Sequence, residues 1–157
     1  MTPIPHAEPP GHPGTVTTWT LDSYDQLGLL RGALTAAVQR QGADAPRQDQ
    51  VATGRRADVA AGLALAASEL ATNALKHAGP PATVSLWTAP EGYLLDVADC
   101  TPAAAPQRPE GRGPGEGGFG LALVTRVADS VGWYATQDAK HVWARFPADE
   151  TGLPGSG

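Results

Sequence analysis

Four polar side chains share one stripe of a segment that is otherwise mostly alanine and leucine. Residues 63–78 read LALAASELATNALKHA, contain no glycine or proline, and are followed by Gly-Pro-Pro, which predicts a helix. Glu69 and Asn73 are four residues apart, and Lys76 and His77 follow Asn73 by three and four residues, so all four share a face. The stripe is either a solvated face with an i,i+4 pair, or a carboxylate, a carboxamide and cations arranged for a ligand.

A second candidate for chemistry is the block at residues 101–118, which holds four prolines and five glycines. Successive glycines let backbone N–H groups converge on an anion, and a helix that begins directly afterwards adds its positive end. Phosphate is therefore the ligand that this pattern predicts. The chain lacks Gly-x-x-x-x-Gly-Lys-[Ser/Thr], which excludes a P-loop. A loop this long is typical of a lid, and a flexible linker is the alternative.

The same block contains Gly-x-Gly-x-x-Gly in two overlapping registers, which start at Gly113 and Gly115. Asp138 follows about twenty residues later, as a dinucleotide site requires. That fingerprint should directly follow a strand, whereas here a proline-rich loop intervenes, and the alternating strand and helix units are too few. A dinucleotide-binding enzyme fragment is therefore the remote alternative.

The elements that must position these residues follow from periodicity. A Ser-x-x-Gln capping box at Ser23 and Gln26 predicts the start of a helix, and Gly42 its end. Residues 43–54 are polar and predict a loop before the long helix. The pattern predicts strands at 16–21, 83–87, 93–98, 132–136 and 141–146, and helices at 23–41, 55–78 (or 58–78) and 119–131.

Composition narrows the class of protein. The chain has 157 residues and a net charge of -5, with no run of Lys or Arg, which argues against a nucleic-acid groove or an anionic membrane surface as partner. One cysteine, Cys100, excludes an internal disulfide and a cysteine-rich zinc site. No apolar run of eighteen residues and no signal-peptide pattern is present, so a soluble cytoplasmic protein is expected. We expect a disordered arm at 1–14, one domain at 15–148 and a flexible tail at 149–157.

Together the motifs resemble a known family. Glu69 and Asn73 on a helix, Asp99 closing a strand, and the Gly-Phe-Gly-Leu of residues 118–121 opening a helix occur in that order. This resembles the GHKL (Bergerat-fold) ATPase superfamily, and within it the small anti-sigma-factor serine/threonine kinases. The most specific part is the signature Ser-Glu-Leu-x-Thr-Asn-Ala-x-x-His-Ala at 68–78. The likeness covers about residues 16–147.

The resemblance implies an α/β two-layer sandwich: a mixed, mostly antiparallel sheet with three main helices on one face and ATP in the helical layer. By the same resemblance, Asn73 is a ligand of Mg²⁺, and Glu69 either is the general base that activates a hydroxyl or orients a metal-bound water. Lys76 falls near the phosphates, and His77 is expected to serve packing. Asp99 accepts the adenine amino group.

The remaining family positions complete the expected site. Gly118 and Gly120, with Phe119 and Leu121 in the same box, form the phosphate cradle, and residues 101–118 are the ATP lid. The family's Asp-x-Gly-x-Gly is replaced by Asp-Cys-Thr-Pro-Ala at 99–103, where the Thr101 hydroxyl would bond adenine. His141 stands where relatives often place an adenine-contacting threonine.

The resemblance implies an ATP-dependent protein serine/threonine kinase in transcription regulation, which binds a sigma factor and phosphorylates a small antagonist protein. An ATP-binding interaction module without phosphate transfer is the alternative. Without a phosphoacceptor helix pair before the domain, a complete sensor histidine kinase is not expected. The strand at 16–21 offers an edge for a homodimer.

Overall fold

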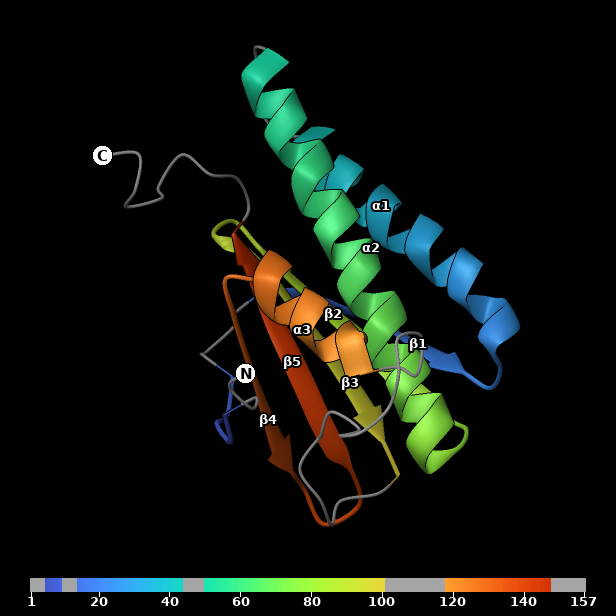
Figure 1. Ribbon diagram of the computed structural model, residues 1–157. Coiled ribbons are helices and arrows are strands. Elements are labelled where there is room, and N and C mark those ends of the chain that lie inside the picture. The colour runs from blue at the N-terminus through green and yellow to red at the C-terminus, as the bar shows by residue number, and fades with distance from the viewer. Residues whose placement is uncertain (1–4, 10–13, 44–49, 101–117, 148–157) are drawn as a thin grey trace.

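The computed structural model describes residues 5–9, 14–43, 50–100 and 118–147. Across these residues the chain forms one five-stranded antiparallel sheet with three α-helices on a single face (Figure 1). The predicted α/β sandwich is therefore confirmed. In chain order the elements are β1 (Thr15–Leu21), the short 3₁₀ helix η1 (Tyr24–Gln26), α1 (Leu27–Ala43), α2 (Gln50–Ala78), β2 (Ala82–Ala89), β3 (Gly92–Asp99), α3 (Gly118–Val127), β4 (Ser130–Ala135) and β5 (Lys140–Pro147).

The sheet order is β1-β2-β3-β5-β4, and every neighbouring pair is antiparallel. A dinucleotide-binding fold is built from parallel strands with crossover helices, so the dinucleotide alternative is wrong. β1 lies at one edge, as the sequence predicted for a pairing surface.

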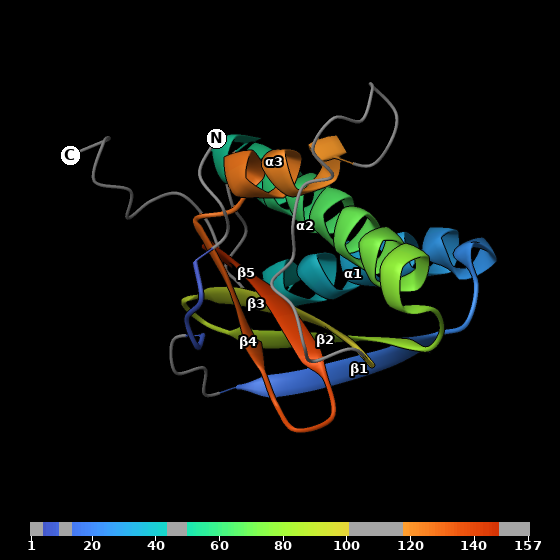
Figure 2. The ribbon, with the colours of Figure 1, turned by 60° about the horizontal axis from the view of Figure 1, so that its bottom comes forward.

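The helices α1, α2 and α3 lie on one face of the sheet (Figure 2). Side chains alternate between the two faces along each strand. On β3, Tyr93, Leu95 and Val97 belong to the core that the sheet shares with the helices. Leu34 of α1 and Leu63 of α2 are fully buried in the same core, and burial of each such leucine contributes about 1.5–3 kcal/mol. Even-numbered residues of β3 therefore point to the face that carries no helix.

Both long helices extend beyond their predicted bounds. The capping box at η1 is confirmed by Gln26, whose side-chain oxygen accepts the backbone N–H of Ser23 at 3.1 Å. However, α1 continues through Gly42, and α2 begins at Gln50 and continues through Gly54. The predicted loop at 43–54 is wrong at both ends, because a glycine inside a helix costs only about 1 kcal/mol relative to alanine.

The third helix is shorter than predicted. It ends at Val127, and the strand β4 begins at Ser130, where the sequence predicted helix through residue 131. The Asp129 backbone N–H already donates to the Arg145 carbonyl at 2.7 Å, so the chain is attached to β5 by that point. The β-branched Val131 then pairs with β5, which its side chain favours over a helix.

Residues 5–9 lie along the outer edge of β4, although the sequence predicted a disordered arm there. The Ala7 N–H donates to the Trp133 carbonyl at 2.8 Å, and the Trp133 N–H donates to the Pro5 carbonyl at 3.0 Å. Proline lacks an N–H but keeps its carbonyl, so a proline-rich segment can still accept from an edge strand. The predicted tail at 149–157 and the predicted lid at 101–118, except Gly118, lie outside the described residues.

Candidate functional site

The predicted stripe on α2 lies on the side of the helix that faces α3. A Cβ atom at Gly62 would lie 3.2 Å from Phe146 Cε2 and 3.8 Å from Val127 Cβ, so this side of α2 contacts β5 and α3. Glu69 and Asn73 follow Gly62 by seven and eleven residues, close to whole numbers of turns. They therefore continue the same side, and both are partly exposed.

The start of α3 lies level with this stripe. α2 and α3 run in opposite directions side by side (Figures 1 and 2), with Val127 beside Gly62. Gly118 lies nine residues before Val127, or about 13.5 Å at about 1.5 Å per residue. The same distance along α2 from Gly62 reaches the turn between Glu69 and Asn73. The unpaired N–H groups of the first turn of α3 therefore lie beside the predicted metal and base residues.

The residues predicted to bind phosphate have two different roles in the structure. Three of them place backbone N–H groups at the start of α3, and the fourth packs in the core. Gly118, Phe119 and Gly120 form the first residues of α3, where their backbone N–H groups have no partner within the helix. Leu121 is almost fully buried and belongs to the hydrophobic core. Its side chain therefore anchors the helix, and only its backbone is placed to contact a ligand. The box's role in phosphate binding stays a prediction.

Lys76 and His77 lie exposed in the last turn of α2, where cations interact favourably with the helix dipole. The exposure of His77 does not support the packing role expected for it. Thr101 lies outside the described residues.

Asp99 closes β3 on the helix-covered face. It lies in register with the alternating core residues of β3, and the residue is only 6% exposed. β3 ends near the C-terminal part of α2 (Figure 1), so the carboxylate lies at the end of the molecule that carries the stripe. A buried carboxylate requires a compensating partner, and Lys140 at the start of β5 lies directly opposite it. The Lys140 Nζ and Asp99 Oδ2 atoms are 3.5 Å apart.

The sequence did not identify Lys140, and at His141 it left one adenine contact of the family open. His141 pairs with Ala98, so its side chain lies on the helix-free face. There His141 Nδ1 lies 2.7 Å from Asp96 Oδ1. Lys140 takes the place beside Asp99 because of the two-residue period of a strand, since the residue opposite Asp99 must share its face. Lys140 could have been identified only from the register of β5 on β3, and no local sequence pattern gives that register.

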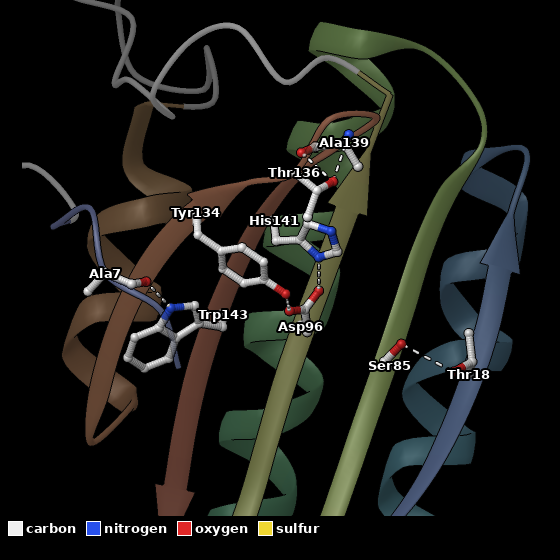
Figure 3. Close-up of polar contacts among 9 residues, drawn as sticks. All are labelled: Ala7, Thr18, Ser85, Asp96, Tyr134, Thr136, Ala139, His141 and Trp143. Carbon is white, nitrogen blue, oxygen red and sulfur yellow. Dashed lines mark hydrogen bonds and ion pairs between the residues drawn. The ribbon is translucent and has the colours of Figure 1, made fainter. Parts of the chain in front are cut away.

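The helix-free face has its own polar cluster, formed by Asp96, Tyr134 and His141 (Figure 3). The Tyr134 hydroxyl donates to Asp96 Oδ2 at 3.0 Å, and the Tyr134 and His141 rings stack with centroids 4.5 Å apart. Burial, followed by the Asp96 carboxylate, raises the pKa of Tyr134 well above its ordinary value. The cluster binds its members to one another, on the face of the sheet opposite to Asp99.

Beside that cluster, Trp143 joins the sheet to the N-terminal segment. Its indole Nε1–H donates to the Ala7 carbonyl at 2.7 Å (Figure 3). A Cβ atom at Gly132 would lie only 2.5 Å from Trp143 Cζ2, so the flat approach of the indole requires glycine at that position. This arrangement is structural.

The described residues contain neither a cluster of metal-binding side chains nor a membrane-spanning helix. Among them, no three His, Cys, Asp or Glu side chains are grouped so as to hold a metal ion. Within the same part of the chain, none of the helices combines the length and hydrophobicity of a membrane span. Asn73 as a single protein ligand would still be compatible with Mg²⁺, because this ion takes few ligands from protein and completes its shell with phosphates and water.

Comparison with known families identifies the domain. The family model described as histidine kinase-like ATPase domain matches residues 21–146, a range that contains α1, α2, β3 and α3 and all but the last residue of β5. A search of curated proteins finds no match. The family match does not distinguish the anti-sigma-factor kinases from other members. The chain belongs to the histidine kinase-like ATPase domain family.

Proposed function

We propose that this chain binds ATP with Mg²⁺ in the helical layer and transfers phosphate to a protein hydroxyl. ATP binding follows from the family. The observation that carries the proposal is Asp99, a buried carboxylate on the helix-covered face at the end of β3. The polar stripe of α2 and the first turn of α3 lie at the same end of the sheet. An adenine-binding group and a phosphate-binding region thus occupy one side of the molecule.

Each residue has a distinct role in the proposal. The Asn73 side-chain oxygen holds Mg²⁺, and the N–H groups at the start of α3 receive the phosphates. The bound Mg²⁺ would neutralise charge on the phosphates. Glu69 accepts the proton of the attacking hydroxyl as the γ-phosphoryl group moves to that oxygen, and ADP leaves. Lys76 adds positive charge near the phosphates.

The proposed substrate is a small antagonist protein, and the proposed partner is a sigma factor. What supports this is the resemblance of the signature at 68–78 to anti-sigma-factor kinases, together with Glu69 one turn before Asn73. The β1 edge is the proposed surface for a homodimer, because β1 is the outermost strand on its side of the sheet.

Calorimetric titration with ATP, with and without MgCl₂, tests the binding proposal. Asn73→Ala should remove the Mg²⁺-dependent part of the affinity and leave the thermal unfolding transition intact. Thr72→Ala is the matched control, because its side chain leaves the same helix about 100° away. An Asn73→Ala protein that binds ATP with unchanged Mg²⁺ dependence contradicts the metal assignment.

Phosphate transfer has a separate test. Glu69→Gln should bind ATP normally and transfer radiolabelled γ-phosphate to a panel of antagonist proteins at least about a hundredfold more slowly. If wild-type protein binds ATP and labels no serine or threonine in that panel, the kinase proposal falls and the ATP-binding interaction module stands.

A further inference from the structure

The Asp99–Lys140 pair has an unusual geometry for a buried ion pair. The two residues are direct cross-strand neighbours, and their side chains are 5% and 13% exposed. A charge-assisted hydrogen bond has a donor–acceptor distance of about 2.7–2.9 Å, whereas here nitrogen and oxygen are 3.5 Å apart. The ammonium thus offsets the charge of the carboxylate without forming a short hydrogen bond to it.

The Lys140 ammonium has donors to offer a ligand. An ammonium group carries three N–H bonds and accepts none. In the part of the chain that the structure describes, Asp99 is the side chain with which Lys140 pairs. Among the described residues no buried side-chain nitrogen or oxygen lacks a hydrogen-bond partner, so the ammonium is not an orphaned donor. One carboxylate oxygen at 3.5 Å uses at most one of the ammonium's three N–H bonds, and a ligand atom that accepts a hydrogen bond could take another in place of water.

Adenine has the complementary pattern. Its exocyclic amino group donates, and the ring nitrogens N1 and N7, one on each side of that amino group, accept. A carboxylate that accepts from the amino group and an ammonium beside it that donates to a ring nitrogen would read two adjacent atoms of the base. Lys140 supplies this donor on the correct face, whereas His141 does not.

We propose that Lys140 is a base-reading residue that donates a hydrogen bond to a ring nitrogen of adenine beside the amino group bound by Asp99. This inference rests on the proposed ATP site and adds a second specificity residue to it. The opposing reading is that Lys140 serves only as a counter-ion. In that reading Lys140→Met weakens the binding of ATP and of its deaza analogues equally, because Lys140 acts only through Asp99.

Nucleotide analogues separate these readings. We would measure the Kd of ATP, 1-deaza-ATP and 7-deaza-ATP for wild-type protein and for Lys140→Met. Wild-type protein should bind one of the two analogues about tenfold more weakly than ATP, because that analogue lacks the accepting nitrogen. Lys140→Met should bind ATP and that analogue equally, since the donor is gone. Lys140→Arg should restore part of the difference.

A matched control lies on the same strand. Arg145→Met removes a cation of β5 whose partner is Asp129, away from Asp99. It should leave the Kd of ATP and the ratio between ATP and its analogues unchanged. Thermal unfolding of each variant establishes that it is folded. The comparison of analogues on wild-type protein needs no variant, so equal affinities would overturn the inference even if Lys140→Met unfolds, and the smaller difference expected of Lys140→Arg then assigns the donor.

Two results would overturn the inference while leaving the ATP site in place. One is equal affinity of wild-type protein for ATP and both deaza analogues. The other is a difference in affinity between ATP and the deaza analogue that is the same in Lys140→Met as in wild-type protein. Failure of wild-type protein to bind ATP at all is a different result, and it would overturn the proposed function itself.

Discussion

Two buried carboxylates on β3, three residues apart, differ in how the protein satisfies them. Asp96 and Asp99 are 8% and 6% exposed, on opposite faces of the sheet. Asp96 has a hydroxyl at 3.0 Å and an imidazole nitrogen at 2.7 Å from its two oxygens. Asp99 has an ammonium at 3.5 Å. Burial is therefore alike for the proposed site carboxylate and for the structural one, and the face of the sheet is what separates them.

The largest expected effect separates the two carboxylates by ligand affinity. Asp99→Ala should weaken ATP binding about a hundredfold, because a hydrogen bond to a charged acceptor in a buried site is lost. Asp96→Ala should change the Kd by no more than about twofold, since Asp96 lies on the face without helices. Calorimetric titration measures both. A larger loss of affinity in Asp96→Ala would reverse the assignment of the two faces.

The second effect concerns stability. Asp96→Ala should lower the free energy of unfolding by about 2 kcal/mol, because Tyr134 and His141 both lose their acceptor. Urea denaturation gives the value. Asp96→Asn keeps one acceptor oxygen and nearly the same volume and should cost less, so equal losses in the two variants would contradict the claim that acceptance by the Asp96 oxygens stabilises the cluster.

Tyr134 makes the stability of the folded protein depend on pH at the Asp96 cluster. Burial and Asp96 raise the pKa of Tyr134 in the folded protein above the unfolded value of about 10. Above that pH the unfolded chain has lost a proton that the folded chain keeps, so stability falls as pH rises. Below it, this contribution is fully present. Tyr134→Phe should flatten the loss of melting temperature between pH 9 and 11, to be measured by thermal scans at about those values. Identical slopes in the two proteins would contradict the proposed environment of Tyr134.

The smallest effect tests whether distance alone makes a pair strong. Arg145 and Asp129 are only 2.7 Å apart, but their side chains are 38% and 42% exposed. Solvent weakens such pairs, so Arg145→Met should change the free energy of unfolding by less than about 1 kcal/mol. A loss as large as that in Asp96→Ala would mean that burial matters less here than the comparison claims.

The sequence was sufficient for features that depend on local pattern or on a family signature. The α/β class, the capping box at Gln26 and the placement of Asp99 at a strand end were all predicted. Glu69 and Asn73 share a face because helical spacing is local. Their roles in binding and catalysis stay predictions.

The features that the sequence missed depend on contacts between distant segments. Lys140 faces Asp99 only because β5 pairs with β3 in one particular register, and a shift of one residue would place His141 there instead. The docking of residues 5–9 was missed for a similar reason. Proline content predicts the absence of regular structure, but an edge strand can still bond to the carbonyl groups of such a segment.

The most direct test of the account is a crystal structure of the protein with Mg²⁺ and a non-hydrolysable ATP analogue. We expect the adenine amino group within hydrogen-bond distance of the Asp99 carboxylate, and Mg²⁺ on the side-chain oxygen of Asn73. An adenine bound elsewhere, with Asp99 still paired to Lys140 and without contact to the nucleotide, would contradict the central claim that the end of β3 on the helix-covered face is the nucleotide site.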